Sequence, residues 1–393
     1  MYINTYNTVA QEGINYLKRK GYKLDQSDQP DGLLMRSQVI HDMEFPNSLL
    51  AIGRAGAGVN NIPVDRCSNE GIIVFNAPGA NSNAVKEITI AMMINLSRNI
   101  FPSVTWTRGL TGPDQDVQVE EGKKQFRGSE LIGKTLGVIG LGNVGSKVAN
   151  AGVDLGMEVI GYDPYIKMKN AWEVDSAVRK VEDITDLFRY ADYITIHTPA
   201  TDETENMLDA SAFEKMKKGV TVINFAREEV CDTDAVKEYI DNGKIKAFAT
   251  DFRIPSLDGY ENVLTTPHIG GTTGPAEAQC AMMAAQELDK FLKTGEITNS
   301  VNFPNVELSF NSPYRLSIIN RNIPNMVGLM STGLAAHQMN IANIINKSAG
   351  DYAYTLIDID NTDETLLNQV ITDLNKIEGI VRVRLIKNNQ DNL

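Results

Sequence analysis

Three glycines at a fixed spacing, Gly140, Gly142 and Gly145, constrain the fold of this chain more than any other feature. They follow the apolar run Thr135–Ile139, which is typical of a buried strand, and a helical pattern follows them. In a βαβ unit with this spacing, the first glycine makes a tight turn and the second lets the backbone approach a pyrophosphate. The third lets the helix pack closely against the strand. The motif therefore predicts a dinucleotide-binding domain.

Asp163 supports this prediction, because it lies 18 residues beyond the last glycine of the motif and closes the next expected strand. An acidic residue in that position accepts hydrogen bonds from the 2′-hydroxyl of the adenosine ribose and repels a 2′-phosphate. The sequence therefore predicts NAD, rather than NADP, as the cofactor.

Short apolar runs alternate with helical patterns throughout the region from residue 99 to residue 274. The expected strands are Thr135–Ile139, Glu158–Tyr162, Tyr193–Ile196, Val220–Phe225, Lys246–Thr250 and Val263–Thr265. Such alternation is typical of a doubly wound α/β fold, in which helices cover both faces of a parallel sheet. Near the start of the region, Gly109–Gly128 is expected to be a long connection.

The regions on either side also contain strands and helices. In residues 1–98 we expect strands at Gly32–Arg36, Leu49–Gly53 and Gly71–Phe75, and helices at Asn7–Lys20 and Val85–Arg98. A helix at Glu277–Thr294 and a linker at 301–313 precede the segment 314–393, which shows the order strand, helix, strand, strand, helix, strand. This βαββαβ order predicts a ferredoxin-like domain.

The amino-acid composition disfavours several classes of binding partner and cellular location. The 393 residues include 37 Lys and Arg against 50 Asp and Glu, a formal charge of −13, which disfavours general nucleic-acid binding. No apolar run approaches the ~20 residues of a membrane span, and the N-terminal residues lack the pattern of a secretory signal. The three cysteines have no metal-ligand spacing and suit buried positions in a reducing cytoplasm, so no metal site is expected.

Two side chains are the strongest catalytic candidates. His268 follows the last expected strand of the nucleotide-binding region, and Arg227 follows an earlier one. Both are therefore expected at the carboxyl edge of the sheet, where doubly wound folds bind ligands. A histidine can exchange a hydroxyl proton near neutral pH, and a guanidinium can hold a carboxylate with two hydrogen bonds. Of the other histidines, His197 also ends an expected strand, whereas His41 and His337 lie away from the cofactor.

These motifs together resemble the D-isomer-specific 2-hydroxyacid dehydrogenase family, and the resemblance covers nearly the whole chain. The segments that carry it are Arg54–Asn61, Asn76–Ser82, Gly140–Gly145, His197–Pro199, Asn224–Arg227, Thr266–Gly271 and Gly295–Pro304. The resemblance implies a substrate domain built from residues 1–98 and 275–300, an inserted NAD-binding domain at 99–274, and an active site in the cleft. It also implies a homodimer or homotetramer.

The resemblance assigns roles to residues that match the family's positions. Arg227 would bind the carboxylate and oxygen of the substrate, and His268 would exchange the proton. Positions that match cofactor contacts are Gly140, Gly142, Asn143, Val144, Gly145, Asp163, Phe225, Ala226, Arg227, Asp251, His268, Gly270 and Gly271. Positions that match the substrate side are Arg54, Ala55, Gly56, Ala57, Gly58, Asn81, Arg227 and His268, with residues 55–58 acting through backbone N–H groups.

Within the family, the chain is most similar to enzymes that oxidise a small phosphorylated 2-hydroxy acid with NAD at the start of L-serine synthesis. The phosphate of such a substrate needs cations, and Arg54 and Arg36 are the candidates. Two alternatives stay open. One is a reductase of glyoxylate or hydroxypyruvate, which needs no phosphate site, and the other is a non-catalytic NAD-sensing protein on the same scaffold.

The chain departs from the family at the usual partner of the catalytic histidine. Ser256 stands where the family has a glutamate, whose carboxylate raises the pKa of the histidine. Either Asp258, Glu261 or Glu228 replaces that glutamate, or His268 works without a carboxylate partner.

The segment 314–393 resembles an ACT domain, a module that binds amino acids. Asn322 and Asn340 match positions on the ligand side of that module. In related dehydrogenases the ligand is L-serine, bound at a subunit interface. The resemblance therefore implies feedback by serine, with a purely dimerising domain as the alternative.

Overall fold

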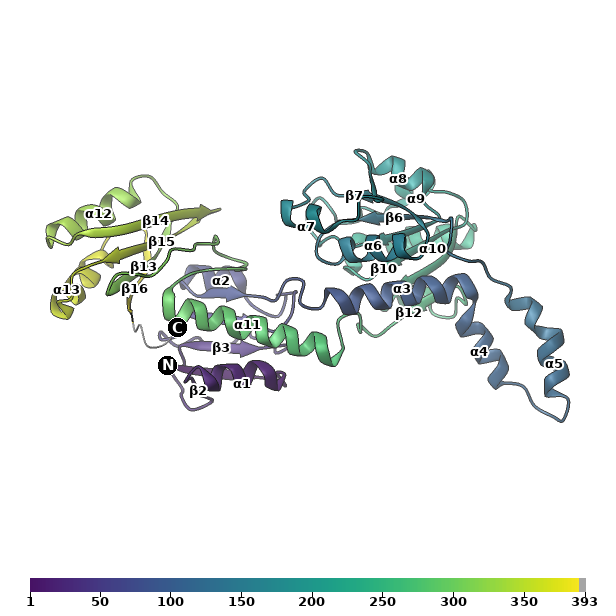
Figure 1. The fold of residues 1–393 in the computed structure, drawn as a ribbon, viewed down its shortest axis with the longest axis horizontal. Helices are drawn as coiled ribbons and strands as arrows, with labels where there is room; N and C mark the ends of the chain where they lie inside the picture. Colours follow the sequence, from purple (N-terminus) through teal and green to yellow (C-terminus); the bar gives the residue numbers. More distant parts are fainter. Residues whose placement is uncertain (389–393) are drawn as a thin grey trace. The chain divides into compact units, whose positions relative to one another are not determined.

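The computed structural model describes residues 1–388, which form two compact units (Figure 1). One unit contains Met1–Asn81 together with the chain from Glu277 onward, and the other contains Ser82–Ala276. All three cysteines are buried, as predicted. Within residues 1–388, no helix is both long enough and apolar enough to span a membrane.

The second unit is built on a seven-stranded sheet in the order β12-β11-β10-β9-β6-β7-β8, and every neighbouring pair is parallel. Its strands are β6 (Thr135–Ile139), β7 (Glu158–Tyr162), β8 (Arg179–Lys180), β9 (Tyr193–Ile196), β10 (Val220–Asn224), β11 (Ile245–Thr250) and β12 (Val263–Thr265). The six expected strands are confirmed. The sequence does not predict β8, because its two residues are exposed and carry no apolar pattern.

Successive residues of the central strands point to opposite faces of this sheet, and helices cover both. Val222 and Ile223 are neighbours on β10, yet they belong to two different apolar clusters. The cluster around Ile223 includes residues of α3 (Ser82–Arg98) and α6 (Gly145–Asp154). The cluster around Val222 includes residues of α8 (Ile184–Tyr190), α9 (Ala210–Lys215) and α10 (Thr233–Asp241). The predicted doubly wound fold is therefore confirmed.

The boundary between the two units falls before α3, whereas the expected substrate region extended to residue 98. The physical reason is that the apolar side of α3 packs on the sheet of the second unit. Val85, Met92 and Met93 are buried there in the same cluster as Val138 of β6.

The segment Gly109–Gly128 contains regular structure, so its prediction as a plain connection is wrong. Helix α4 (Ile100–Arg108) leads into it, and it contains α5 (Gln115–Gly122) and the 3₁₀ turn η1 (Lys123–Phe126). These helices project from their own unit (Figure 1). The sequence gives no signal for α5, because none of its residues is buried and apolar periodicity is therefore missing.

The first unit contains a second parallel sheet in the order β2-β1-β3-β4-β5. Its strands are β1 (Tyr2–Tyr6), β2 (Lys23–Leu24), β3 (Gly32–Met35), β4 (Ala51–Arg54) and β5 (Ile73–Phe75). Its helices are α1 (Gln11–Arg19), α2 (Val64–Asn69) and the long α11 (Gly274–Thr294), most of which belongs to this unit. Helices α1 and α11 touch closely, since a Cβ on Gly13 would lie 2.6 Å from the carbonyl oxygen of Ala281.

The C-terminal segment has the predicted βαββαβ order and folds as an antiparallel sheet, β14-β15-β13-β16. Its elements are β13 (Tyr314–Arg321), α12 (Met326–Ala336), β14 (Ile341–Ala349), β15 (Tyr352–Ile359), α13 (Glu364–Leu374) and β16 (Ile380–Lys387). One face of the sheet forms an apolar cluster with both helices, through residues such as Ile318, Met330 and Leu367.

The opposite face of this sheet packs on the α/β part of the same unit. Ile319, Tyr354 and Leu356 belong to one apolar cluster with Leu17 of α1 and Phe291 of α11. The C-terminal sheet therefore shares a core with the part that precedes it.

Polar side chains of the same sheet donate hydrogen bonds to carbonyl oxygens at the C-terminal end of α11. The pairs are Arg384 with the carbonyl oxygens of Phe291 and Leu292, Arg315 with that of Thr294 at 3.0 Å, and the Tyr354 hydroxyl with that of Gly295 at 2.6 Å. The last carbonyl groups of a helix have no partner within the helix, and positive charge is favourable at that end. The sheet therefore caps the longest helix of the unit.

Arg315 also forms an ion pair with Asp358 between neighbouring strands, and both side chains are 0% exposed. Nε of Arg315 donates to Oδ1 of Asp358 at 2.6 Å, and Nη2 donates to Oδ2 at 3.0 Å. The pair is therefore bidentate and anchors the strand that reaches α11.

Replacing Arg315 with leucine should lower the free energy of unfolding by about 3–5 kcal/mol, because the charge of Asp358 would stay buried without a partner. Urea unfolding followed by circular dichroism measures this change. Arg253→Leu is the matched control, since it breaks an exposed ion pair with Asp258 and should cost at most about 1 kcal/mol.

The double variant Arg315→Leu/Asp358→Leu should recover much of the loss, because it removes both buried charges together. An Arg315→Leu protein as stable as the Arg253→Leu control would contradict this account of the ion pair.

Candidate active site

The glycine motif lies at the carboxyl end of β6, where the order of the strands in the sheet reverses. β7 pairs with one edge of β6 and β9 with the other. The loop that leaves β6 therefore faces the crevice in which doubly wound folds bind nucleotides. Gly140 has a φ of +85°, and a Cβ on Gly145 would lie 1.8 Å from the Gly140 carbonyl oxygen. Only glycine fits at these two positions.

The surroundings of Gly142 fit a bound phosphate. A Cβ on Gly142 would meet no atom closer than Nδ2 of Asn170 at 3.9 Å, so this backbone is open to a ligand. Helix α6 begins at Gly145, and its N-terminus favours an anion. Beside the loop, the buried hydroxyl oxygen of Thr198 has no hydrogen-bond partner in the described part of the chain. Open backbone next to an unsatisfied hydroxyl group fits a dinucleotide.

Asp163 follows β7 and holds the glycine loop. Its Oδ2 accepts a hydrogen bond from the Leu141 backbone N–H at 2.8 Å, and its Oδ1 accepts one from Tyr165 at 2.9 Å. The half-buried carboxylate therefore lies at the edge of the loop, as a contact with the cofactor ribose requires.

His197 lies behind the glycine loop as a neutral ring. A Cβ on Gly140 would lie 2.8 Å from the His197 carbonyl oxygen, and the His197 ring shares a hydrogen bond of 2.9 Å with the Thr195 hydroxyl. Burial lowers the pKa of His197 to about 3, so the ring stays uncharged near neutral pH. The His197 ring therefore supports the glycine loop without placing a positive charge beside it.

Arg227 is positioned by Asn224, the last residue of β10. The Asn224 side chain accepts a hydrogen bond from the Ala226 backbone at 3.0 Å and donates one to the Arg227 carbonyl oxygen at 2.7 Å. The Arg227 guanidinium is half-buried and donates to the Ala226 carbonyl oxygen at 2.7 Å. An asparagine side chain commonly forms a hydrogen bond with the backbone two residues ahead. An asparagine at the end of a strand is therefore the sequence signal for the role of Asn224.

Asp251, at the end of β11, organises the loop that carries His268. Its buried carboxylate accepts hydrogen bonds from the Thr266 hydroxyl at 2.5 Å and from the backbone N–H groups of Ile269 at 2.8 Å and Gly270 at 2.7 Å. The sequence resemblance assigned Asp251 to the cofactor. The structure adds that its carboxylate fixes the conformation of the loop that carries His268.

His268 itself is exposed and has a φ of +53°, a left-handed conformation that few residues other than glycine adopt. Its backbone N–H donates to the Asp251 carbonyl oxygen at 3.1 Å. The edge of its ring packs on Phe252, with the ring centroids 5.2 Å apart. A strained backbone at a candidate catalytic residue is typical of a functional site.

No carboxylate replaces the missing glutamate as a hydrogen-bond partner of the His268 ring within residues 1–388. Asp258 instead pairs with Arg253 at 2.7 Å. Glu228 is exposed, and Glu261 lines a different cavity beside α3 and α4. The structure therefore gives His268 an aromatic neighbour in place of a carboxylate.

In the first unit, the predicted substrate loop follows β4. The backbone N–H groups of Ala55 and Gly56 donate to the carbonyl oxygens of Met35 and Arg54, at 2.7 and 2.8 Å, and their contact with substrate stays a prediction. The N–H groups of Ala57 and Gly58 have no protein acceptor in the described part of the chain.

Of the two candidate phosphate cations, Arg36 is already paired. Nη2 of Arg36 donates to Oε1 of Glu277 at 2.7 Å. Nε of Arg54 donates to the Arg36 carbonyl oxygen at 3.1 Å, and a Cβ on Gly56 would collide with the Arg54 guanidinium. Arg54 is thus held against the substrate loop.

The predicted effector residues lie in the C-terminal domain. The Asn322 side chain donates to the Gly350 carbonyl oxygen at 3.0 Å, and Asn340 is exposed just before β14. Across residues 1–388, no three potential ligands are grouped as a metal ion would require.

Comparison with known proteins identifies relatives of the whole chain. Residues 90–270 match the family described as D-isomer specific 2-hydroxyacid dehydrogenase, NAD binding domain. The chain is 36% identical over 326 residues to D-3-phosphoglycerate dehydrogenase of Archaeoglobus fulgidus, a match that covers 77% of this chain and 59% of that protein. The chain therefore spans less than two thirds of that relative. It is 29% identical over 405 residues to D-3-phosphoglycerate dehydrogenase of Haemophilus influenzae, covering 98% and 94% of the two chains.

A solved structure gives a similar result. The NAD⁺-bound 3-phosphoglycerate dehydrogenase of Entamoeba histolytica superposes with a TM-score of 0.62 and 26% sequence identity. The superposition covers 77% of this chain and 98% of that one.

The low pKa of His197 predicts a loss of stability in acid. Below about pH 6.5 the ring takes up a proton in the unfolded chain, whereas in the folded chain it stays neutral down to about pH 3. The unfolded state therefore binds more protons, and the free energy of unfolding falls as the pH falls through this window.

His197→Gln should show a smaller fall than the unmodified protein between pH 6.5 and pH 4.5, because glutamine does not titrate. Urea unfolding at several pH values measures the difference, in which the titration of all other groups cancels. Identical pH dependence in the two proteins would show that His197 does not contribute.

Proposed function

Because the chain belongs to the D-isomer-specific 2-hydroxyacid dehydrogenase family, we propose that it is an NAD-dependent D-3-phosphoglycerate dehydrogenase. It would oxidise 3-phospho-D-glycerate to 3-phosphohydroxypyruvate, the first step of L-serine synthesis. One observation carries the proposal: Arg227 and His268 follow strands β10 and β12 of the same parallel sheet whose strand β6 ends in the glycine loop. The relatives of that name, one of them matched over 98% of this chain, support the choice of substrate.

NAD, when bound, supplies the acceptor for the hydride that leaves C2 of the substrate. His268 takes the proton of the C2 hydroxyl group on a ring nitrogen, which is feasible because its side chain is exposed on a fixed loop. The Arg227 guanidinium holds the substrate carboxylate and polarises the C2 oxygen, since its fork of N–H donors matches a carboxylate.

The substrate side of the proposal uses residues of the first unit. Arg54 is the better candidate for the phosphate, because its guanidinium lies against Gly56 in the loop after β4. Ala57 and Gly58 offer backbone donors, and Asn81 completes the set.

The proposal extends to regulation and assembly. L-serine would bind the C-terminal domain at Asn322 and Asn340, and the chain would form a homodimer or homotetramer. A cytoplasmic location agrees with three buried, unpaired cysteines. The βαββαβ order of the domain supports the serine site.

The test of the activity is oxidation of NADH with 3-phosphohydroxypyruvate, hydroxypyruvate and glyoxylate, each with and without L-serine. We expect fast turnover only with the phosphorylated substrate, and inhibition by millimolar serine. Preference for the unphosphorylated acids would instead favour the reductase, and NADH binding without turnover would favour a sensor. Turnover that serine leaves unchanged would remove the effector from the proposal.

Asp251→Asn should lower kcat on the order of 10²-fold, because the amide has one acceptor oxygen and the His268 loop needs both oxygens of the carboxylate. Steady-state kinetics with NADH and 3-phosphohydroxypyruvate measure the effect, beside the thermal unfolding midpoint. Thr266→Val is the control, since it removes only one of the three hydrogen bonds and should have a smaller effect on kcat. Equal kcat in Asp251→Asn and the unmodified protein would exclude Asp251 as a positioning residue.

A further inference from the structure

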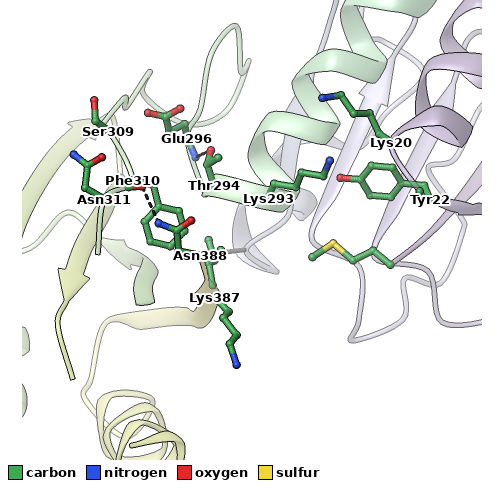
Figure 2. A pocket seen from close by; sticks show the side chains of 13 residues that line it. Lys20, Tyr22, Lys293, Thr294, Glu296, Ser309, Phe310, Asn311, Lys387 and Asn388 are labelled. Carbon is green, nitrogen blue, oxygen red and sulfur yellow. Dashed lines mark hydrogen bonds between the residues drawn. The ribbon is translucent and has the colours of Figure 1, made fainter. Parts of the chain in front are cut away.

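The first unit contains a cavity of about 620 Å³ that none of the functions above uses (Figure 2). Five segments of the chain line it: Met1, the turn between α1 and β2, the end of α11 with the residues after it, the segment 309–311, and the end of β16 with Asn388. A cavity of this size lies within the range of small-molecule sites, about 300–1,000 Å³.

Two lysines on one side of the cavity share a single carboxylate. Nζ of Lys293 lies 3.0 Å from Oδ1 of Asp289, and Nζ of Lys20 lies 4.0 Å from Oδ2. Asp289 itself is buried and also accepts hydrogen bonds from the hydroxyl groups of Tyr16 at 2.8 Å and Tyr22 at 3.0 Å. Burial raises the pKa of both tyrosines, so they remain neutral donors. The single negative charge of Asp289 therefore lies beside two positive charges, those of Lys20 and Lys293.

The other charged residues of the lining do not cancel this excess. Glu296 accepts a hydrogen bond from the Leu308 backbone at 2.8 Å through Oε1, and its Oε2 lies 3.6 Å from Nζ of Lys290. Lys387, at the far side, pairs with Glu364 at 3.0 Å. Each of these charges already has a partner, so the unmatched positive charge stays at Lys20 and Lys293.

Figure 2 shows Lys20, Lys293 and the Tyr22 hydroxyl on one side of the cavity, with Phe310 and Asn388 on the other. Tyr22, Phe310 and Ile386 give the cavity an apolar component. The Asn388 side chain donates to the Phe310 carbonyl oxygen at 2.9 Å and to that of Ser312 at 3.1 Å, so its own oxygen is left to accept a hydrogen bond. A ligand with one anionic end and a short body that carries a donor would match both sides.

We propose that this cavity binds a small organic anion, whose carboxylate or phosphate group lies between Lys20 and Lys293. Ammonium groups bind both kinds of anion as compact point charges. Asn322 and Asn340, the proposed serine residues, are not part of the lining, so the cavity is a separate site. The inference does not depend on the proposed dehydrogenase activity.

An occupant of the cavity would contact both the α/β part of the unit and the C-terminal sheet. The turn at Lys20 belongs to the α/β part, and Asn388 follows the last strand of the sheet. A ligand that binds only when these segments are assembled stabilises their assembly by mass action. Binding should therefore raise the thermal unfolding midpoint of the full chain.

Isothermal titration of the full chain with 3-hydroxybutyrate and with glycerol 3-phosphate tests the proposal and distinguishes the two anion classes. We expect millimolar or tighter binding of at least one probe. Lys293→Met and Lys20→Met should each weaken it about tenfold or more, the effect of losing one hydrogen bond to a charged group. Lys18→Met is the matched control. Lys18 is exposed on α1, the helix that precedes the turn with Lys20, and it does not line the cavity. This variant loses the same charge and should bind the probes like the unmodified protein.

Lys293→Arg separates a lost charge from a damaged fold, since it keeps the charge and should keep most of the binding. Failure of both probes to bind at millimolar concentration would overturn the proposal. Binding that Lys20→Met and Lys293→Met leave unchanged would overturn it as well, because the anion would then lie elsewhere.

Discussion

The candidate active site depends on the fact that the strands in both α/β sheets run parallel. Consecutive parallel strands need a crossover connection, so their carboxyl ends gather at one edge of the sheet. In the second unit this brings the glycine loop after β6, Arg227 after β10 and His268 after β12 to the same edge. In the first unit the same rule puts the loop after β4 at the carboxyl edge. Within the second unit, strand direction therefore brings Arg227 and His268 to the edge of the sheet that also carries the glycine loop.

Strand direction brings these residues to the edge, but individual hydrogen bonds set their orientation. The Asn224 amide fixes the turn that carries Arg227, and the Asp251 carboxylate fixes the loop that carries His268. Both are buried polar groups whose hydrogen-bonding capacity is used by backbone and hydroxyl groups of the loops. Because an unsatisfied buried polar group is costly, each of them holds its loop in one conformation.

The same distinction explains what the sequence could predict. Six of the seven strands in the sheet of the second unit can be predicted because their apolar runs and the glycine motif are local signals, and Arg227 and His268 follow from their position after such runs. Helix α5 has no buried residue, so its sequence carries no periodic signal. The contact of the C-terminal sheet with the end of α11 uses polar residues such as the half-buried Arg384 and the buried Tyr354, which resemble surface residues in a sequence. Their role appears only when α11 and the sheet are seen together.

The absence of a carboxylate beside the His268 ring separates two contributions that the family's glutamate makes together. A carboxylate partner both orients the imidazole and stabilises its protonated form. Here, orientation comes from the left-handed backbone of His268, held by Asp251, and from the edge contact with Phe252. In the proposed reaction, these contacts rather than a carboxylate would hold the His268 ring while it takes the proton of the C2 hydroxyl group.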